Sequence, residues 1–317
     1  MATQKEHLKT LMKLNVFALG VMHVANRVIG SLSSGKNMLK PVNGKYYQWQ
    51  YGDVFYHKYG KGSPLLLLHD LNPENSAFEW DEVIEDLSEN HTLYVIDLPG
   101  CGRSAKPNIS YTNYLYVLFL NRFINDVIKQ QTDIIADGYS SSFVLMAALD
   151  KDSQIGYITA VNPHSFSDLI QPSDKKAVLA KNLIDSPIIG TTVYNMVMSR
   201  QNIDFRFTEE YLYNPFRSKQ RFVDAFYEGS HFGESKGKYL LASFAGKYMS
   251  VDITKAVKEI GSRLTIFYGD NCENGEEIAK NYQKLNHDIK VKSIAKVKYL
   301  PSLERPEEFL AAYNIYK

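Results

Sequence analysis

The sequence predicts an α/β fold, a mainly parallel sheet with helices on both faces. Short continuous apolar runs, such as residues 64–68 and 93–97, are typical of strands that are buried on both faces of a parallel sheet. These runs alternate along the chain with helix-like segments, which is the pattern of parallel α/β domains. One long interval, residues 167–250, interrupts the alternation and predicts an insertion.

The composition is that of an ordinary globular protein. Of 317 residues, 44% are hydrophobic and 22% are charged, and the net charge of +1 gives no electrostatic reason to expect nucleic acid as a partner. Two cysteines, Cys101 and Cys272, are too few for a disulfide framework, which favours the cytoplasm. The sequence has no Cys/His cluster at zinc spacing, no Walker-type loop and no glycine-rich dinucleotide fingerprint, so we expect no cofactor.

Residues 1–40 read as an N-terminal helix, with apolar residues at roughly helical spacing from 8 to 32. Polar residues interrupt the pattern, so no run approaches the roughly 20 apolar residues that a membrane span requires. No clear small-x-small cleavage site follows. Three interpretations remain: a helix that packs on the domain, which fits best; a helix that rests on a membrane surface; and an export or anchor signal. The interrupting residues are Asn15, His23, Asn26 and Arg27.

The first half of the domain follows this pattern element by element. Residues 45–59 predict a hairpin, because two alternating aromatic-rich runs flank a Gly52-Asp53 turn. Strands are expected at 64–68, 93–97 and 132–136, and helices at about 79–88 and 112–129.

The second half continues the alternation after a break. A helix follows Ser140, strands are expected at 157–161, 264–268 and 289–294, and helices at about 276–286 and from Pro306. The interval 167–250 is helix-like and aromatic, and an insertion at this place is expected to cover the carboxyl edge of the sheet, where ligands bind. We therefore expect a core of residues 41–166 and 251–317, with a helical cap at 167–250.

The turn at residues 137–142 is the most informative motif. An apolar strand precedes it, a helix follows it, and Ser140 lies between the small residues Gly138 and Ser142. This layout is typical of a nucleophile elbow, in which a sharp turn exposes a serine. A small-x-Ser-x-small pattern alone is weak, since it arises often by chance.

Three further motifs occur in an order that resembles the α/β-hydrolase family, from about residue 45 to the C-terminus. Residues 67–71 look like the strand-end His-Gly motif, 97–104 are very close to Asp-x-Pro-Gly-x-Gly-x-Ser, and 300–309 are similar to the segment that follows the catalytic histidine. The resemblance implies an α/β-hydrolase fold and an ancestor that was a serine hydrolase acting on esters or similar acyl compounds.

The resemblance also assigns the site. It implies that Ser140 is the nucleophile and that the backbone amides of Leu71 and Ser141 form the oxyanion hole. Asp70 replaces the glycine usually found beside Leu71, and its carboxylate would repel an oxyanion if it pointed inward. At the histidine position stands Tyr299, and at the acid position stands Cys272.

These substitutions predict little or no ordinary esterase activity, because a tyrosine that titrates near ~10 is no general base at neutral pH. The leading interpretation is a hydrolase-like protein whose cap covers a pocket for a small apolar ligand. Tyr299 then fills the histidine's volume and hydrogen-bonds Ser140, and Cys272 is an ordinary small apolar residue. The rival is a working hydrolase that uses His164 as a relocated base, with Asp270 as a candidate acid. A third class is a membrane-surface or partner-binding protein that uses residues 8–32.

Overall fold

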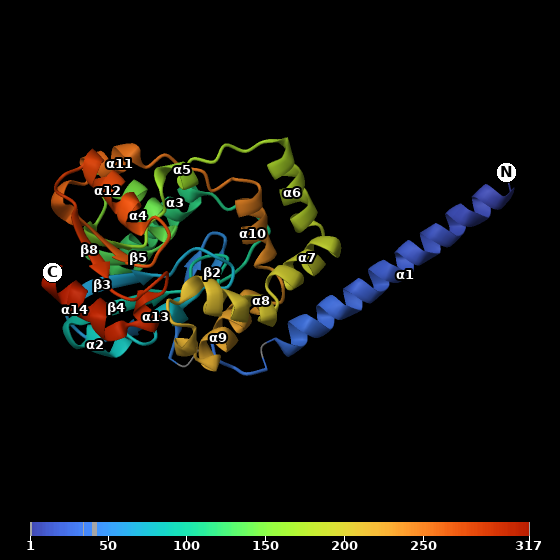
Figure 1. The fold of residues 1–317 in the computed structure, drawn as a ribbon, viewed down its shortest axis with the longest axis horizontal. Helices are drawn as coiled ribbons and strands as arrows, with labels where there is room; N and C mark the ends of the chain where they lie inside the picture. The colour runs from blue at the N-terminus through green and yellow to red at the C-terminus, as the bar shows by residue number, and fades with distance from the viewer. Residues whose placement is uncertain (1, 34, 40–42, 317) are drawn as a thin grey trace.

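The computed structural model describes residues 2–33, 35–39 and 43–316 of the chain. An eight-stranded sheet lies at the centre, with helices on both faces, and one long helix extends away from the body (Figure 1). The strand order is β1-β2-β4-β3-β5-β6-β7-β8. The strands are β1 (Lys45–Trp49), β2 (Gly52–Tyr59), β3 (Ser63–Leu68), β4 (His91–Ile96), β5 (Thr132–Asp137), β6 (Ile155–Val161), β7 (Leu264–Gly269) and β8 (Lys290–Ile294).

Helices connect and cover these strands. In chain order they are α1 (Ala2–Leu32), η1 (Ala77–Trp80), α2 (Ile84–Asn90), α3 (Asn113–Phe123), η2 (Ile124–Ile128), α4 (Ser140–Ala147), α5 (Phe166–Leu169), α6 (Lys175–Asp185), α7 (Ile189–Val197), α8 (Arg200–Phe205), η3 (Arg206–Tyr211), η4 (Pro215–Arg217), α9 (Gln220–His231), α10 (Lys238–Ala245), α11 (Thr254–Glu259), η5 (Gly261–Arg263), α12 (Gly275–Leu285), α13 (Pro301–Glu304) and α14 (Pro306–Tyr316).

The sheet confirms the predicted fold class. The β1–β2 hairpin is antiparallel and joins the sheet through an antiparallel β2–β4 pair, whereas the pairs from β4 through β3, β5, β6 and β7 to β8 are parallel. The run 65–68 in β3 is fully buried. Its alternate leucines enter opposite layers, since Leu66 and Leu68 join the core under α3 and α4, whereas Leu65 and Leu67 pack with Trp80 and Phe309.

The interval between β6 and β7 is helical, as its sequence indicates. Helices α6 to α10 occupy it, and part of it has a small core of its own that also includes Leu300 and Leu303 from the C-terminal segment. The predicted boundary between residues 40 and 41 lies outside the described residues.

Helix α1 departs from the favoured expectation that it packs on the domain. Residues 6–25 are exposed, and α1 touches the body near its C-terminal end, where the Asn26 amide donates to the carbonyl of Ile188 at 3.2 Å and to the hydroxyl of Thr192 at 3.0 Å. Within the described part of the chain, the segment Glu6–Leu32 alone is long and apolar enough to cross a membrane, a test that a signal sequence also passes. The packing interpretation is therefore wrong for most of this helix.

Candidate active site

The turn between β5 and α4 is where the sequence places a nucleophile. The turn residue in the left-handed region is Gly138, with φ of 50°, whereas Ser140 is already the first residue of α4. In a nucleophile elbow the strained turn position itself presents the nucleophile. The expectation that Ser140 occupies this position is wrong by two residues, and a glycine stands there.

The hydroxyl of Ser140 has a structural role. Ser140 is fully buried, and its Oγ donates to the backbone carbonyl of His69 at 2.6 Å. This bond ties the start of α4 to the end of β3. A serine with its proton committed to a carbonyl, and with no exposed surface, has neither the base nor the access that a nucleophile needs.

Two backbone amides converge on the position where an oxyanion hole is expected. The N–H groups of Leu71 and Tyr139 both donate to the same carboxylate oxygen, Asp70 Oδ1, each at 2.7 Å. The amide after the turn residue and an amide of the loop after β3 are the two donors of such a hole. Leu71 therefore takes the predicted part, but Ser141 does not: its amide donates to the carbonyl of Gly138 within the first turn of α4.

Asp70 also fills the space that a nucleophile would need. A Cβ atom built on Gly138 would lie 2.2 Å from Asp70 Oδ1, well inside van der Waals contact. The second carboxylate oxygen accepts a hydrogen bond from the side-chain amide of Asn72 at 2.8 Å, which fixes the carboxylate in place. The side chain thus occupies the hole and the nucleophile position together.

Asp70 is one of three neighbouring carboxyl groups. Glu79 and Asp137 are buried, and both oxygens of Glu79 accept from the Asp70 amide at 3.2 Å. Burial, together with the negative charge of Asp70, raises the pKa of Glu79 to about 8. Burial and the charge of Glu79 likewise raise the pKa of Asp137 well above its ordinary value. Between residues 43 and 316, as in the described N-terminal part, no group of three or more such side chains is arranged to hold a metal ion.

His69 has a structural role. Its Nδ1 lies 2.7 Å from the Asp70 carbonyl, and its Nε2 accepts from the Leu98 amide at 3.0 Å. These partners place the ring proton on Nδ1. Burial lowers the pKa of His69, so the ring is neutral at pH 7.

Cys272 and Tyr299 lie near one another at the carboxyl edge of the sheet, linked by Asn162. The Cys272 thiol donates to Asn162 Oδ1 at 3.2 Å, and the Asn162 amide nitrogen donates to the Tyr299 carbonyl at 3.1 Å. Burial raises the pKa of Cys272 to about 12 and also raises the pKa of Tyr299 above its ordinary value. Neither side chain can supply a base or an anionic partner at neutral pH.

The relocated base fails for geometric reasons. The ring of His164 packs against the Tyr139 ring, with centroids 5.7 Å apart, and the Ser140 proton that it was expected to accept already points to the carbonyl of His69. Asp270 is exposed and ties the loop after β7 to the loop after β8, because its Oδ1 accepts from the Lys296 amide at 2.8 Å. These residues do not assemble into a triad with Ser140.

A further buried carboxylate joins the inserted helices to the loop after β3. Arg206 donates from Nε to Glu74 Oε1 at 3.0 Å, and the Tyr211 hydroxyl donates to the same oxygen. Burial raises the pKa of Glu74 although Arg206 opposes the rise. This cluster lies on the loop that carries Asp70. The insertion therefore stabilises the loop whose Asp70 side chain lies at the expected oxyanion hole.

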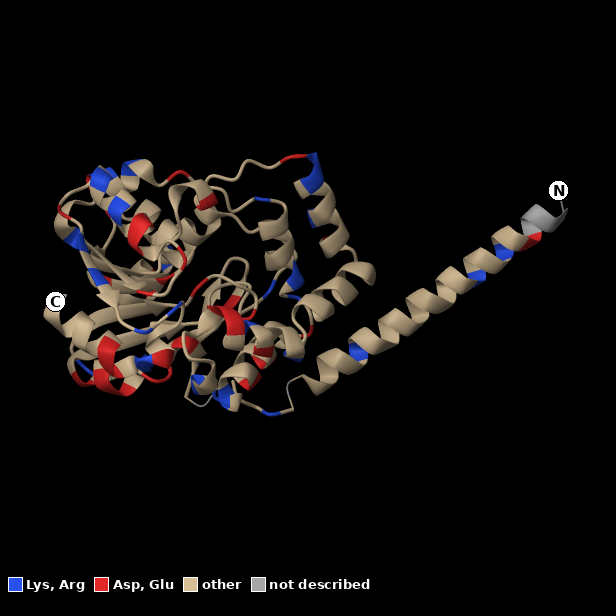
Figure 2. Cartoon of the chain, viewed as in Figure 1, with Lys and Arg blue, Asp and Glu red and all other residues tan. Residues whose placement is uncertain are grey.

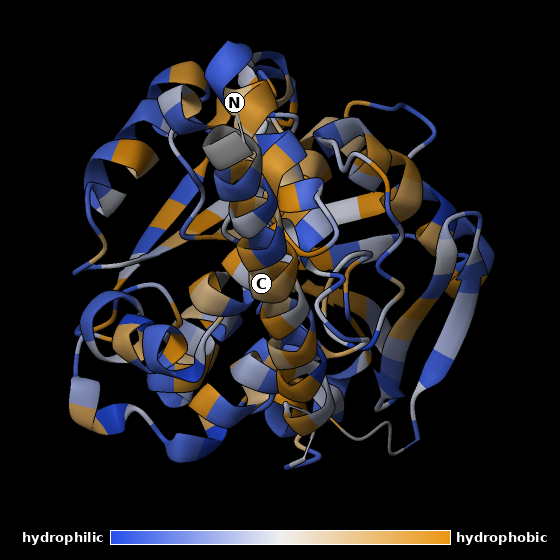
Figure 3. Ribbon diagram, turned by 90° about the vertical axis from the view of Figure 1, so that its right-hand side faces the viewer, coloured by the Kyte–Doolittle hydropathy of each residue, from blue (hydrophilic) through white to orange (hydrophobic). Residues whose placement is uncertain are grey.

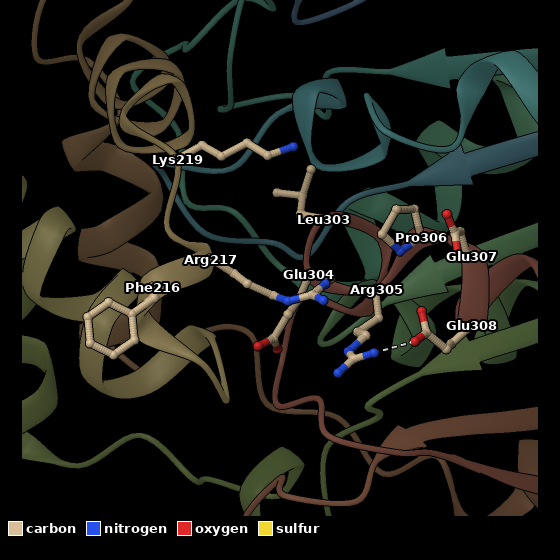
Figure 4. A pocket seen from close by; sticks show the side chains of 9 residues that line it. All are labelled: Phe216, Arg217, Lys219, Leu303, Glu304, Arg305, Pro306, Glu307 and Glu308. Atoms are coloured by element: carbon tan, nitrogen blue, oxygen red, sulfur yellow. Dashed lines mark hydrogen bonds and ion pairs between the residues drawn. The ribbon is translucent and has the colours of Figure 1, made fainter.

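One open pocket of about 440 Å³ lies away from Asp70, between the segment after η4 and the start of α14. Figure 4 shows Lys219 and Arg217 reaching in from the insertion, opposite the Arg305–Glu308 ion pair of the C-terminal segment. Arg217 donates to the carbonyl of Glu304 at 2.6 Å. The pocket lining is strongly charged, so it is not the apolar pocket that the sequence predicts.

The sequence interpretation missed three residues that shape the site. The sequence pattern gives Gly138 only as a small neighbour of Ser140, and it assigns no role to Glu79 or Asp137. The sequence does contain a sign of the role of Asp70, because a carboxylate replaces the glycine usually found next to an amide of the oxyanion hole.

Comparisons with known proteins agree with this architecture. No family model matches the chain. A haloalkane dehalogenase from Agrobacterium fabrum (strain C58 / ATCC 33970) is 24% identical over 106 residues, which are 33% of this chain and 34% of that protein. A 2-hydroxy-6-oxo-6-(2'-aminophenyl)hexa-2,4-dienoic acid hydrolase from Metapseudomonas resinovorans is 34% identical over 70 residues, 22% of this chain and 24% of that protein. The chain thus spans about a third and about a quarter of the length of these two relatives.

Solved structures match over much more of the chain. The epoxide hydrolase CorEH has a TM-score of 0.69 at 16% identity, covering 86% of this chain and 97% of its own. The crystal structure of a membrane phospholipase A has a TM-score of 0.67 at 15% identity, covering 98% of this chain and 97% of its own. Together with the strand order and the strand–turn–helix at Gly138, these likenesses show that the chain has the α/β-hydrolase fold.

Proposed function

We propose that this protein is a hydrolase-fold protein without serine-hydrolase activity, in which the former catalytic centre serves as structure. One observation supports this most directly: Asp70 Oδ1 accepts from both hole amides, Leu71 and Tyr139, and lies where a side chain at Gly138 would have to be. A substrate carbonyl cannot enter a hole that already holds a carboxylate oxygen. The substitutions at Tyr299 and Cys272 support the same conclusion.

Labelling with a fluorophosphonate probe tests the proposal, because such probes report an activated serine without knowledge of the substrate. The natural chain is compared with Ser140→Ala and with an active serine hydrolase as positive control. We expect no labelling of either form of this protein. Labelling of the natural chain that disappears in Ser140→Ala would overturn the proposal and restore Ser140 as a nucleophile.

The protein retains an inserted cap, and a small apolar ligand beneath it is part of the same proposal. The apolar character of the insertion next to Leu300 and Leu303 supports the class of ligand, although the buried cluster of Phe207, Phe222 and Phe226 would have to open to admit it. The probe is decanoic acid, with thermal unfolding as the readout. A rise in Tm that saturates with decanoic acid is expected. An unchanged Tm at a concentration that saturates a known fatty-acid binder would exclude this class of ligand.

The location that we propose is the cytoplasmic surface of a membrane. Two observations support it: α1 is apolar and exposed along residues 6–25, and the likeness to the membrane phospholipase A structure covers 98% of this chain. Sedimentation of the full chain with phospholipid vesicles tests this part. Recovery of the chain in the supernatant with every vesicle composition would contradict it.

A further inference from the structure

Helix α1 exposes an unusual amount of apolar surface. Large hydrophobic side chains along it are between 36% and 71% exposed, and the 27-residue segment Glu6–Leu32 has no buried part in its most apolar window. Monomeric proteins rarely leave a contiguous apolar surface of this kind without a partner. The exposed side chains are Leu8, Leu11, Met12, Leu14, Val16, Phe17, Leu19, Val21, Met22, Val24, Val28 and Leu32.

The charged side chains of α1 from residue 6 onward lie on one side of it: Glu6, Lys9, Lys13 and Arg27. The three basic residues are separated by four and by fourteen residues, and Glu6 precedes Lys13 by seven. At about 100° per residue these spacings place the basic residues within about 40° of one another and Glu6 about 20° from Lys13. The exposed apolar side chains cover more than half of the remaining circumference of the helix, and we call this part of its surface the apolar arc. Figure 2 shows the result, a long uncharged stretch between basic bands near the two ends of α1.

This arrangement suits a bilayer surface better than a span or a helix pair. Residues 14–26, between Lys13 and Arg27, rise by about 20 Å as a helix, which is short of the roughly 30 Å hydrocarbon core. A second copy of α1 would cover only a narrow stripe, as in a coiled coil, and would leave most of the apolar arc in water. A helix in the interface plane can bury the whole arc and keep its basic side at the headgroups.

The neighbouring helices of the insertion extend this surface. Helix α7 lies beside the C-terminal part of α1 (Figure 1), where Asn26 bonds to Thr192 of α7, and α6 packs against α7 in turn. Their apolar side chains Leu179 and Met196 are 70% and 66% exposed. Two further lysines, Lys175 and Lys176, begin α6 and are exposed. Figure 3 views the molecule from this side and shows orange apolar positions on α1 and on the helices around it.

We propose that α1, together with the exposed side chains Leu179 and Met196 of α6 and α7, forms one surface that binds the face of an anionic phospholipid bilayer, with α1 lying in the interface plane. The inference rests on the membrane location proposed above and names the surface that provides it. The apolar arc supplies the burial, and Lys9, Lys13 and Arg27 face the lipid phosphates. The occupant is the bilayer itself, not a second copy of the chain.

Vesicle sedimentation of the full chain tests this surface with two matched variants. Leu14→Asp/Val21→Asp and Lys9→Gln/Lys13→Gln each lower the net charge by two, but only the first pair alters the apolar arc. All four side chains are exposed, so both variants are expected to fold. We expect the first pair to abolish sedimentation with all vesicles. The second pair is expected to lower partitioning into vesicles of phosphatidylcholine with phosphatidylglycerol about tenfold or more, and to leave partitioning into phosphatidylcholine alone unchanged.

The part played by α6 and α7 has its own variant. Leu179→Asp/Met196→Asp is expected to weaken partitioning several-fold without abolishing it. Unchanged partitioning would remove these helices from the surface. Equal loss in the two α1 variants would contradict the assignment of separate apolar and basic sides.

A cysteine placed at Glu6, seven residues before Lys13 and therefore on the same side of α1, distinguishes the in-plane helix from a span. The Glu6→Cys chain is added to sealed vesicles and then treated with a membrane-impermeant maleimide, with the natural chain as control. Labelling of the bound protein is expected, because residue 6 stays at the headgroups on the outer side. Protection of the bound protein would show that α1 spans, and a dimer that persists without vesicles but is lost in Leu14→Asp/Val21→Asp would show that a second copy covers it. Neither outcome depends on fluorophosphonate labelling, which tests the catalytic proposal separately.

Discussion

Asp70 Oδ1 accepts a hydrogen bond at 2.7 Å from the backbone N–H of Tyr139, the amide that directly follows the turn residue Gly138. In a working hydrolase this amide stabilises the oxyanion of the reaction intermediate. Here a side-chain carboxyl oxygen receives the same bond, and under the proposed function this bond serves the stability of the resting structure instead of catalysis.

The first prediction concerns this bond. Asp70→Ala leaves the amides of Leu71 and Tyr139 without their acceptor, and we expect a loss of about 1–3 kcal/mol in the free energy of unfolding. Asp70→Asn keeps an acceptor oxygen and removes a charge that faces Glu79, so its cost should be less than half as large. Urea denaturation measures both. An Asp70→Ala chain as stable as the natural one would show that water replaces the carboxylate without loss.

The second prediction concerns pH. Glu79 has a pKa raised to about 8 in the folded chain, against an ordinary value near 4.5, so the folded state holds the proton more tightly than the unfolded state. The stability that this proton provides is fully present below pH ~4.5 and is lost as the pH rises through about 8. The free energy of unfolding of the natural chain, relative to that of Glu79→Gln, should therefore fall between pH 5 and pH 8.

The comparison with Glu79→Gln is needed because other groups oppose this trend. His69 and His231 are buried with lowered pKa values, so their contribution to stability rises with pH. They are the same in both chains and cancel in the difference. Asp137, whose pKa Glu79 helps to raise, does not cancel, so the difference reports the Glu79–Asp137 pair. A difference that stays constant from pH 5 to pH 8 would mean that Glu79 adds no bound proton to this pair in the folded chain.

The fold was predictable from the sequence because its signals are local. The leucine run of β3 and the aromatic hairpin of β1 and β2 contain their own burial pattern, and short apolar runs that alternate with helices indicate a parallel sheet. The position of α1 was not predictable in this way. Whether an apolar helix packs depends on a complementary surface elsewhere in the fold. In α1 the region of Asn26 contacts such a surface, at Ile188 and Thr192.

The site is harder to predict from the sequence than the fold, and Gly138 shows why. A search for a serine between two small residues selects Ser140, although the backbone geometry places the turn two residues earlier. The role of Asp70 depends on the approach of the β3 loop to the β5 turn, which no local pattern records. Tyr299 and Cys272 can be assigned from the sequence because neighbouring motifs fix their register, and Asn162 links the two residues in space.

A third prediction concerns the buried ion pair beneath the site. Asp97 is buried, which opposes its ionisation, yet Arg103 binds it through Nε at 2.6 Å and lowers the pKa of Asp97 to about 2. Arg103→Ala leaves this charge buried without its partner and should cost about 3–5 kcal/mol. The exposed pair Glu276–Lys280 is the control, and Glu276→Gln should leave the urea midpoint unchanged. Equal midpoints for the two variants would contradict the assignment.

A fourth prediction concerns thiol reactivity. Burial raises the pKa of Cys272 to about 12, and burial raises the pKa of Cys101 further still. The thiolate is the reactive form, so neither residue should react with Ellman's reagent in the native protein at pH 8. Both should react once urea has unfolded the chain. Rapid reaction of a thiol in the native state would contradict this, and its loss in Cys272→Ser would assign it to Cys272, the less buried of the two.

The most direct test of the central claim is a double-mutant cycle between Asp70 and Gly138. The four chains are the natural one, Asp70→Gly, Gly138→Ala and Asp70→Gly/Gly138→Ala, and urea denaturation gives the free energy of unfolding of each. A methyl group at Gly138 would lie 2.2 Å from Asp70 Oδ1, so Gly138→Ala should cost at least about 2 kcal/mol more in the natural chain than in Asp70→Gly. Equal costs of Gly138→Ala in the two backgrounds would show that the Asp70 carboxylate does not occupy the place of the nucleophile.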